Sequence, residues 1–473
     1  MRGLVFTYAD LDTLIVWPRQ TDKRRHAVFN REDEKVDLRR TEGMSGSQIL
    51  EDLRLRGLIH DCTDVEALRK RLDDGPITVY CGFDPTADSL HIGHLAPLLL
   101  LRRFQDAGHT AIALAGGATG MIGDPSGRSE ERNLLDKITI SSNIEAVSDQ
   151  LRLILRSEND LESATETSLL VDNLDWTAEA NLLGFLRDVG KHVTVGTMLA
   201  KDSVRSRLEG DRGISFTEFS YMLLQANDFY ELNKRHGCEL QIGGSDQWGN
   251  ITAGIDLIRR RSGETTYGLT VPLLTRSDGA KFGKTAEGSV WLDSRRTLPY
   301  ELHQYFLNVD DRDVEQYLLR LTLVSVTEVA ALMAEHLEYP EERRAQSRLA
   351  DEVCDLIHGT GETGRARLAA EGLFGATEPT SHMLEALRGI VPESEVFLKD
   401  LVSEDSLLEV LVSSGLCSSK GDARRTVDGG GIKVNGIRQT GTFRLSESVV
   451  IEGGYVLLQK GKRSRHLLVV VDK

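Results

Sequence analysis

The 473-residue sequence contains only five cysteines, and they lie far apart. None forms a Cys-x-x-Cys pair, and no group of Cys and His has the spacing of a zinc site. We therefore expect neither a disulfide framework nor structural zinc. No apolar run approaches the ~20 residues that a membrane span requires, and the chain does not open on a basic segment followed by an apolar core. A cytoplasmic location without membrane attachment is the default expectation.

Basic residues are outnumbered, with 57 Lys and Arg against 73 Asp and Glu, for a net charge of -16. This balance argues against indiscriminate binding to nucleic acid, because attraction to phosphate grows with the number of Lys and Arg contacts. The stretch 411–473 differs, with eleven Lys or Arg against five Asp or Glu. That end of the chain is a candidate RNA-binding surface.

The chain is longer than one hydrophobic core usually allows, so we expect two or three domains. Apolar runs such as 77–81 and 111–115 alternate with longer helical stretches, which indicates an α/β fold with a Rossmann-like parallel sheet. An α-helical domain and a small α+β domain are expected to follow. Four regions are predicted: an N-terminal extension outside the fold (1–46), a catalytic domain (47–298), a helical domain with a linker (299–400) and an RNA-binding domain (401–473). Met44 is an alternative start of the protein.

The segment 80–94 reads Tyr-Cys-Gly-Phe-Asp-Pro-Thr-Ala-Asp-Ser-Leu-His-Ile-Gly-His and connects an apolar strand to a helical run. Backbone amides at a helix N-terminus favour anions, and two imidazoles there can donate to phosphate oxygens. Gly93 lets a nucleotide approach the backbone closely. Taken alone, His91 and His94 are more often residues that cap or line a helix.

A Gly-rich segment at 116–132 also follows an apolar strand, and by itself it is as consistent with a turn as with a ligand loop. A second segment, 241–250, follows the short strand 239–242 and places a carboxylate where a ribose would lie in a nucleotide-binding sheet. Ligands of such sheets sit beyond the carboxyl ends of the strands. Both segments are therefore candidate parts of one site.

Ser215-Phe216-Thr217-Glu218 has the pattern of a capping box and predicts a helix start. Tyr221, Gln225 and Asp228 follow at spacings of four and three, which place them on one helical face. On periodicity alone a solvated polar face is the commoner explanation. The stretch Lys281-Phe282-Gly283-Lys284-Thr285 is likewise, by itself, typical of a solvated loop, although two lysines there can reach a triphosphate.

These clusters, in this order, resemble the class I aminoacyl-tRNA synthetases, and 80–94 resembles the bacterial tyrosyl branch of that family. The resemblance covers 45–473, and it implies that tyrosine is activated with ATP and then transferred to the 3' end of tRNA(Tyr). The implied catalytic residues are His91, His94, Thr86, Arg128, Arg132, Lys281, Lys284 and Thr285. The implied tyrosine-binding residues are Tyr80, Asp124, Tyr221, Gln225, Asp228 and Gln247. The implied ATP-binding residues are Cys81, Gly82, Asp84, Gly93, Gly244, Asp246 and Lys284.

The basic carboxyl end resembles the small RNA-binding fold first named for a ribosomal small-subunit protein, and this likeness assigns Lys420, Arg424 and Arg425 to the RNA backbone. A solvated basic helix is the alternative. The family also implies a homodimer with L-tyrosine, ATP and tRNA(Tyr) as partners. Magnesium would arrive with ATP, and no metal site or tightly bound cofactor is expected.

Four positions depart from the family pattern and are expected to tune rates: Pro97, Arg128, Asn227 and Arg276. Two rival functions remain. One is a synthetase of the same class that uses tryptophan, against which Tyr80 and Asp228 argue. The other is an RNA-binding protein that keeps the fold without catalysis, against which the intact histidine and lysine motifs argue.

Overall fold

The structure, a computed structural model, describes residues 44–126, 135–155, 168–209, 213–280, 282–285, 288–375, 378–441 and 444–471. Nearly all of the predicted N-terminal extension lies outside these ranges. In the described part, no helix is long and apolar enough to cross a membrane.

A six-stranded sheet forms the centre of the first half of the chain, with the order β1-β6-β5-β2-β3-β4. Its strands are β1 (Asp61–Cys62), β2 (Thr78–Phe83), β3 (Thr110–Ala115), β4 (Ser168–Asp172), β5 (Cys238–Gly244) and β6 (Tyr267–Val271). All neighbours are parallel except β1, which pairs antiparallel with β6. The α/β class predicted from the alternating pattern is confirmed.

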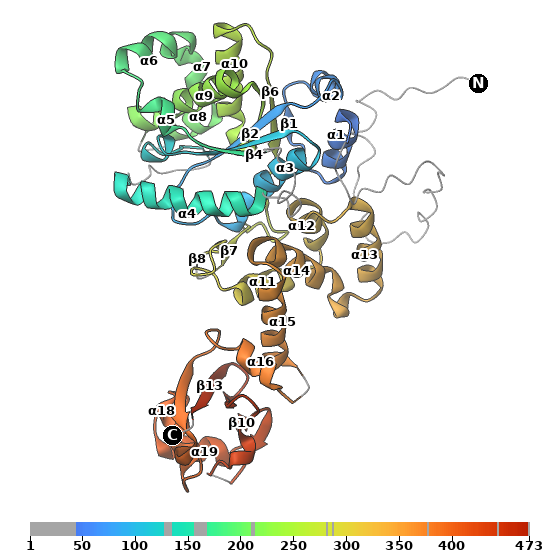
Figure 1. Ribbon diagram of the computed structural model, residues 1–473, viewed down its shortest axis with the longest axis vertical. Coiled ribbons are helices and arrows are strands. Elements are labelled where there is room, and N and C mark those ends of the chain that lie inside the picture. Colours follow the sequence, from blue (N-terminus) through green and yellow to red (C-terminus); the bar gives the residue numbers. More distant parts are fainter. Residues whose placement is uncertain are drawn as a thin grey trace, which may run out of the picture. The chain divides into compact units, whose positions relative to one another are not determined.

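Helices cover both faces of this sheet (Figure 1). They are α3 (Leu95–Asp106) and α4 (Lys137–Leu155) on one face, with α9 (Phe216–His236) and α10 (Trp248–Arg261) on the other. Successive strand residues point to opposite faces, so Val79, Cys81 and Phe83 enter the core that contains α3. Tyr80, between them, packs instead with Phe229 of α9.

The strand order reverses at β2. The chain runs from β2 outward to β3 and β4, and then returns to β5 on the other side of β2. In doubly wound sheets the crevice beyond the carboxyl ends at such a reversal binds ligands. The register aligns Tyr80 of β2 with Gln241 of β5, so both strands deliver side chains to this crevice.

Helix α9 is fixed at both ends. Ser215 caps it by accepting a hydrogen bond from the Glu218 amide, and Gly237 ends it in the left-handed conformation at φ 59°. Glu218 also forms a buried bidentate pair with Arg207 of α8 (Asp202–Leu208), with N–O distances of 2.9 and 2.8 Å. A helix held in this way provides a rigid platform for the polar side chains along it.

A hairpin and a helical region follow the sheet. The hairpin consists of β7 (Lys284–Thr285) and β8 (Gly288–Ser289), and the helices are α11 (Pro299–Leu307), α12 (Val314–Leu321), α13 (Val326–Glu338), α14 (Arg344–His358) and α15 (Thr360–Phe374). Phe282, just before the hairpin, packs against the ring of Tyr317 with centroids 4.7 Å apart. This contact anchors the hairpin to the helices.

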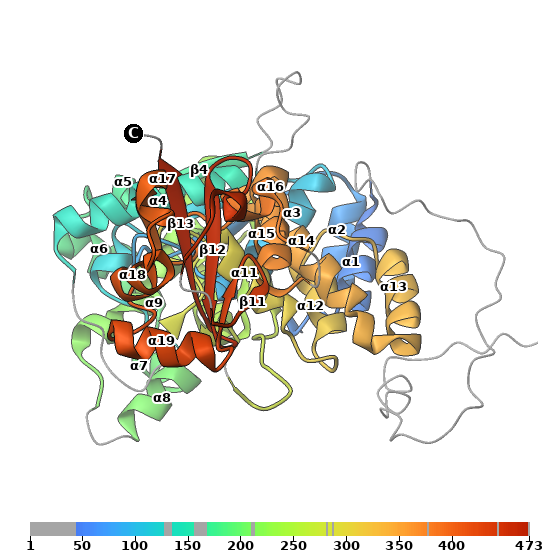
Figure 2. The ribbon, with the colours of Figure 1, turned by 90° about the horizontal axis from the view of Figure 1, so that it is seen from below.

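The last part of the chain is built on a five-stranded sheet of order β11-β10-β12-β13-β9 (Figure 2). Its strands are β9 (Glu393–Phe397), β10 (Ile432–Val434), β11 (Ile437–Gln439), β12 (Tyr455–Lys460) and β13 (Ser464–Val471). α18 (Ser406–Ser413) and α19 (Lys420–Asp428) pack on one face. α16 (Ser381–Ala386) packs on the other.

A buried ion pair joins α1 (Gly46–Leu55) to the helical region. Arg56 Nε donates to Asp52 at 2.8 Å, and Arg56 Nη1 donates to the carbonyls of Leu319 and Val324 at 3.2 and 2.9 Å. Both side chains of the pair are buried. Removing only one partner would therefore leave an uncompensated buried charge.

We expect Arg56→Met to lower the free energy of unfolding by about 3–5 kcal/mol, because Asp52 is then buried without its partner. Urea denaturation measures this change. Arg54→Met is the matched control: its pair with Glu51 is exposed, so a change below about 1 kcal/mol is expected. Equal effects of the two substitutions would contradict the buried-pair account.

Candidate active site

A buried carboxylate lies near the Tyr80 side chain of β2. Asp228 of α9 is 2% exposed. It accepts hydrogen bonds from Asn173 Nδ2 at 2.9 Å and from Trp176 Nε1 at 2.8 Å. The hydroxyl of Tyr80 is also buried, and it has no hydrogen-bond partner among the described residues. A group supplied from outside the chain can satisfy such a buried polar atom.

Burial raises the pKa of Asp228 to about 7, although the bonds from Asn173 and Trp176 partly oppose this rise. Burial, and then the nearby charge of Asp228, also raises the pKa of Tyr80 well above its ordinary value. Near neutral pH the phenol of Tyr80 is therefore protonated while Asp228 exchanges between its two forms. The pair presents a hydroxyl donor beside a carboxylate acceptor.

A chain of hydrogen bonds runs from Asp228 toward the strand ends. Asn173 Nδ2 also donates to Thr119 Oγ1 at 2.9 Å, and Thr119 Oγ1 donates to Asp84 Oδ1 at 2.7 Å. Tyr221 donates its hydroxyl to Asp84 Oδ2 at 2.8 Å. The network therefore connects Tyr221 and Asp84, which the sequence assigned to different substrates.

Asp124, which is buried, and Gln247, which is half-buried, form a second polar group. Gln247 Nε2 donates to Asp124 Oδ2 at 2.7 Å, and the Ser126 amide donates to the other carboxylate oxygen at 2.9 Å. Gln225 Oε1, on the same face of α9 as Tyr221, is buried without a partner among the described residues. A carboxylate together with unpaired amide oxygen suits an ammonium group.

The two histidines stack in a tight turn before α3, with ring centroids 3.9 Å apart. The His91 amide donates to His94 Nδ1 at 3.2 Å, and the Gly93 amide donates to His91 Nδ1 at 3.1 Å. Because each Nδ1 accepts, the proton of each neutral ring is on Nε2. The turn thus fixes the tautomer of both rings and makes each Nε2 a donor.

The other predicted nucleotide residues lie at the carboxyl ends of β2 and β5. Cys81 is buried, and burial raises the pKa of its thiol to about 12, so it is a neutral group. Gly82 and Thr86 are exposed, as is Asp246. A Cβ at Gly244 would lie 2.6 Å from Asp246 Oδ1, so a larger residue there would displace that carboxylate.

Three predicted catalytic residues, Arg128, Arg132 and Lys281, lie outside the described residues. Lys284 is exposed on β7, with Thr285 following it in the same strand. It lines a cavity of about 780 Å³ together with Trp291 and residues of α11. The cavity lining in the described part of the chain does not include the two histidines.

Pro97 lies in the first turn of α3, where proline is tolerated because that amide has no intrahelical partner.

Two of the three predicted RNA-binding side chains on α19 are already paired with acids. Lys420 contacts Glu409 at 2.8 Å, and Arg424 contacts Asp405 at 3.9 Å. Arg425 is exposed on the same helix. Both pairs are exposed, and exposed ion pairs contribute little stability.

Sequence reasoning missed the residues that orient Asp228. Asn173 and Trp176 follow β4. Residues that directly follow an apolar strand are the same signal that identified the other site segments. Thr119 stands inside the Gly-rich segment but received no role. Applying the strand-end rule to 168–172 would have found the first two residues.

Comparisons with known proteins agree with this geometry. A family model described as tRNA synthetases class I (W and Y) matches residues 72–375, and one for the SYY-like C-terminal domain of tyrosine–tRNA ligase matches 388–468. The tyrosine–tRNA ligase of Opitutus terrae is 50% identical over 427 residues, covering 89% of this chain and 100% of that protein. The tyrosine–tRNA ligase of Geobacillus stearothermophilus is 46% identical, with coverages of 89% and 99%. Among solved structures, a C-terminally truncated mitochondrial tyrosyl-tRNA synthetase of Aspergillus nidulans matches with a TM-score of 0.63 and 34% identity, over 69% of this chain and 94% of that one.

The chain belongs to the class I tRNA synthetases of the tryptophan and tyrosine group, because the family model spans more than half of it. Its function within that class is that of a tyrosine–tRNA ligase, an enzyme that uses ATP as a substrate. The resemblance identified from the sequence motifs is confirmed, as is the predicted activity. The roles of individual residues stay predictions.

We expect tyrosine to bind more weakly as the pH falls below about 7. A phenol that donates to the Asp228 carboxylate stabilises the ionised form, so the complex holds fewer protons than the free enzyme, whose pKa there is about 7. Calorimetric titration between pH 5.5 and 8 should show affinity falling up to about tenfold per unit below the pKa. Asp228→Asn should remove this dependence, and a flat wild-type profile would contradict it.

Proposed function

We propose that the crevice reads tyrosine by its phenol hydroxyl and activates its carboxylate with ATP. The observation that carries this proposal is the buried Tyr80 hydroxyl, which has no partner among the described residues and lies close enough to the buried Asp228 for the charge of that carboxylate to raise the pKa of Tyr80. A phenol hydroxyl can accept from Tyr80 and donate to Asp228 at once. Phenylalanine would leave the buried Tyr80 hydroxyl without a partner and would give Asp228 no donor beyond Asn173 and Trp176, which is costly. The indole of tryptophan has a donor only, so this pair favours tyrosine over the nearest rival.

The ammonium group of tyrosine would lie at the other end of the same helical face. Tyr221 and Asp228 are seven residues apart, or about 10 Å along the axis at 1.5 Å per residue. Side chains reaching inward from both positions span a molecule of tyrosine's length. Asp124, supported by Gln247, supplies the negative charge, and Gln225 supplies an oxygen acceptor.

ATP would lie over the histidine turn, with its ribose at Gly244 and Asp246. The tyrosine carboxylate then attacks the α-phosphate in line and pyrophosphate leaves. Catalysis rests on positioning and on charge stabilisation, because no enzyme group forms a covalent bond. The Nε2 donors of His91 and His94 would meet phosphate oxygens. Thr86, Lys284, Thr285 and the residues outside the described ranges, Arg128, Arg132 and Lys281, are proposed to assist.

ATP is proposed to enter as its magnesium complex. Among the described residues, no group of three or more His, Cys, Asp or Glu is arranged to hold a metal ion. The ion would therefore be held mainly by the phosphates and water, which is usual for magnesium. A ribose hydroxyl at the 3' end of the RNA then displaces AMP from tyrosyl-adenylate.

RNA recognition is proposed for the last domain, through α19. Lys420, Arg424 and Arg425 would exchange their carboxylate partners for phosphates, which positions RNA without reading its sequence. The domain boundaries predicted from the sequence and a cytoplasmic location are proposed as well. An RNA-binding protein without catalysis is disfavoured by the buried pocket, because RNA binding by itself does not need it.

We expect Tyr80→Phe to lower kcat/KM for tyrosine in adenylate formation by about tenfold, because one hydrogen bond to the phenol is lost in a dry pocket. The value for phenylalanine should change little, so discrimination narrows by the same factor. Tyr339→Phe is the matched control, since that hydroxyl contacts only Glu338 at the surface. Unchanged discrimination in Tyr80→Phe would overturn the phenol assignment.

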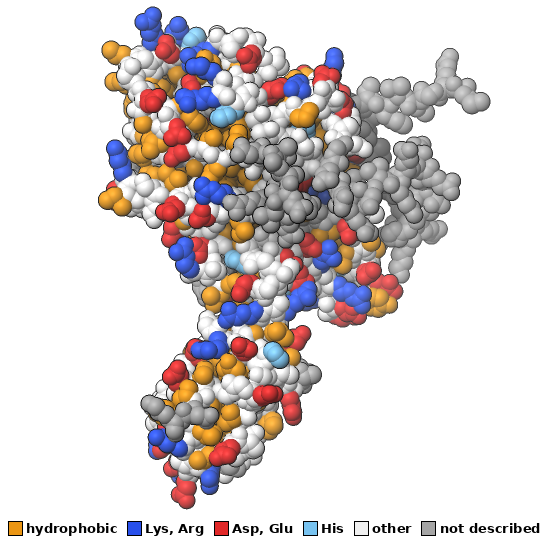
Figure 3. Space-filling model, viewed as in Figure 1, with side chains coloured by type: hydrophobic (Ala, Val, Ile, Leu, Met, Phe, Trp, Pro, Cys, Tyr) orange, Lys and Arg blue, Asp and Glu red, His pale blue; other side chains and the backbone are white. Residues whose placement is uncertain are grey.

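A homodimer is proposed from an exposed apolar face. Figure 3 shows hydrophobic side chains gathered where α6 to α9 reach the surface. Leu183 of α6 (Leu182–Asp188) is 78% exposed, Val195 of α7 (Val195–Leu199) 62%, and Phe216 at the start of α9 79%. Large exposed apolar patches mark interaction sites, and a two-fold axis lets such a patch bury its own copy.

Sedimentation is expected to give twice the 52.4 kDa mass of one chain. Leu183→Glu should weaken the dimer strongly by placing two charges in the contact. Leu337→Glu on α13 is the matched control, because Leu337 is equally exposed at 77% but lies away from this face. A monomeric wild type, or equal effects of the two substitutions, would contradict the proposed contact.

A further inference from the structure

Helix α4 holds the turn that carries the two histidines, through contacts outside the proposed substrate pockets. Gln150 Oε1 accepts from the Leu90 amide at 2.8 Å, and Gln150 Nε2 donates to Ser89 Oγ at 3.1 Å. One face of the same helix carries Asn143, whose Nδ2 donates to the Pro85 carbonyl at 3.0 Å. The spacing of seven residues places both amides on that face. The segment between β2 and α3 is therefore fixed at two points.

Ser89 is the centre of these contacts. Its buried hydroxyl donates to the Leu90 carbonyl at 2.7 Å. The same oxygen accepts from the Asp293 amide at 3.1 Å and from Gln150. A hydroxyl has one donor and two acceptor sites, so every site of Ser89 is used. Loss of any one partner changes the geometry of the others.

The same region joins the histidine turn to the segment that carries Gly283 and Lys284. We call residues 290–293 the strap. The Ile92 amide donates to the Val290 carbonyl at 3.0 Å, and the Leu292 amide donates to the Leu90 carbonyl at 2.8 Å. The Val290 amide in turn donates to the Gly283 carbonyl at 2.9 Å. Val290 is thus bonded to both motifs, and Gln150 and Ser89 fix the end of this ladder.

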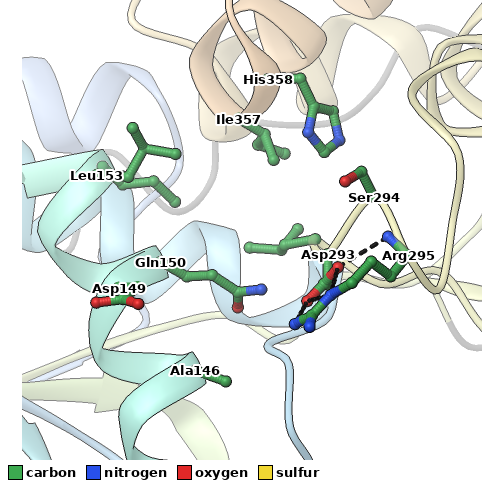
Figure 4. Close-up of a pocket in the computed structure, with 11 residues that line it drawn as sticks. Ala146, Asp149, Gln150, Leu153, Asp293, Ser294, Arg295, Ile357 and His358 are labelled. Atoms are coloured by element: carbon green, nitrogen blue, oxygen red, sulfur yellow. Dashed lines mark hydrogen bonds and ion pairs between the residues drawn. The ribbon is translucent and has the colours of Figure 1, made fainter.

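Figure 4 shows the Gln150 side chain extending from α4 toward Asp293, with the His358 ring above both of them across an open space. This space is a cavity of about 260 Å³, and Gln150, Asp293 and His358 all line it. A side chain beside a cavity is not fixed by close packing on that side. Hydrogen bonds to Leu90 and Ser89 therefore determine where the Gln150 amide lies.

We propose that Gln150 is a positioning residue for adenylate formation, acting through Ser89 on His91 and on the strap. This inference rests on the proposed role of the histidines. Donors that stabilise developing charge must be held within about 0.5 Å of the productive geometry, and a shift of about 1 Å can cost up to 10²-fold in rate. The tyrosine pocket lies on the opposite face of the sheet, with Tyr80 and α9. Gln150 therefore affects the rate and not the binding of tyrosine.

The test is single-turnover formation of tyrosyl-adenylate by the full chain. Gln150→Met keeps the length of the side chain and removes both hydrogen bonds. The rate constant at saturating tyrosine and ATP is expected to fall about tenfold, while the dissociation constant of tyrosine stays within about twofold. Ser89→Ala should reproduce this pattern, and the double variant should be less than additive because the two residues form one network.

Asp149→Asn is the matched control. Asp149 lines the same cavity, but its carboxylate contacts only Arg152 at the surface, so a wild-type rate is expected. The proposal is overturned if Gln150→Met and Ser89→Ala react at the wild-type rate. It is also overturned if both variants bind tyrosine more weakly by the same factor by which their rate falls and also unfold at a lower temperature than the wild type. A wild-type chain that forms no adenylate with tyrosine would instead refute the proposed function itself.

Discussion

The buried carboxylate of Asp228 is the interaction on which the arrangement of the crevice depends. An ionised group that is almost fully buried is strongly unfavourable unless hydrogen bonds surround it. Asn173 and Trp176 supply two donors from the segment after β4. In the proposed complex, the phenol hydroxyl of tyrosine would add a third donor to this carboxylate.

The fold brings the parts of this site together from distant positions in the chain. Tyr80 comes from the strand at which the order reverses, and Asp228 comes from a helix fixed at its start by the buried Arg207–Glu218 pair. The histidine turn continues β2 on the other side of the sheet. In the proposed complex, the amino acid and the nucleotide would approach the strand ends from two faces of the sheet. Small displacements of either face change the distance between the reacting groups.

The sequence predicted what local patterns determine. The spacing of Tyr221, Gln225 and Asp228 identified one helical face, and strand-end motifs identified the crevice. It did not predict the partners of Asp228, because Asn173 reaches it only when β4 pairs beside β3. Gln150 lacked any signal for the same reason. Its partners Ser89 and Leu90 are 61 and 60 residues away, and a single glutamine in an amphipathic helix looks like a surface residue.

The resemblance to the family also assigned to different substrates two residues that are in contact in the structure. Asp84 was assigned to ATP and Tyr221 to tyrosine, yet they share a hydrogen bond of 2.8 Å. This bond lies between the two proposed substrate positions, where the tyrosine carboxylate would meet the α-phosphate. The division into two substrate sites is therefore less sharp than the motifs imply.

The central claim is that the crevice selects an amino acid by its phenol and joins it to AMP. Its most direct test is exchange of labelled pyrophosphate into ATP without RNA, measured separately with tyrosine, phenylalanine and tryptophan. The account predicts rapid exchange with tyrosine and far slower exchange with the other two. Comparable exchange with phenylalanine or tryptophan would contradict the reading of Tyr80 and Asp228.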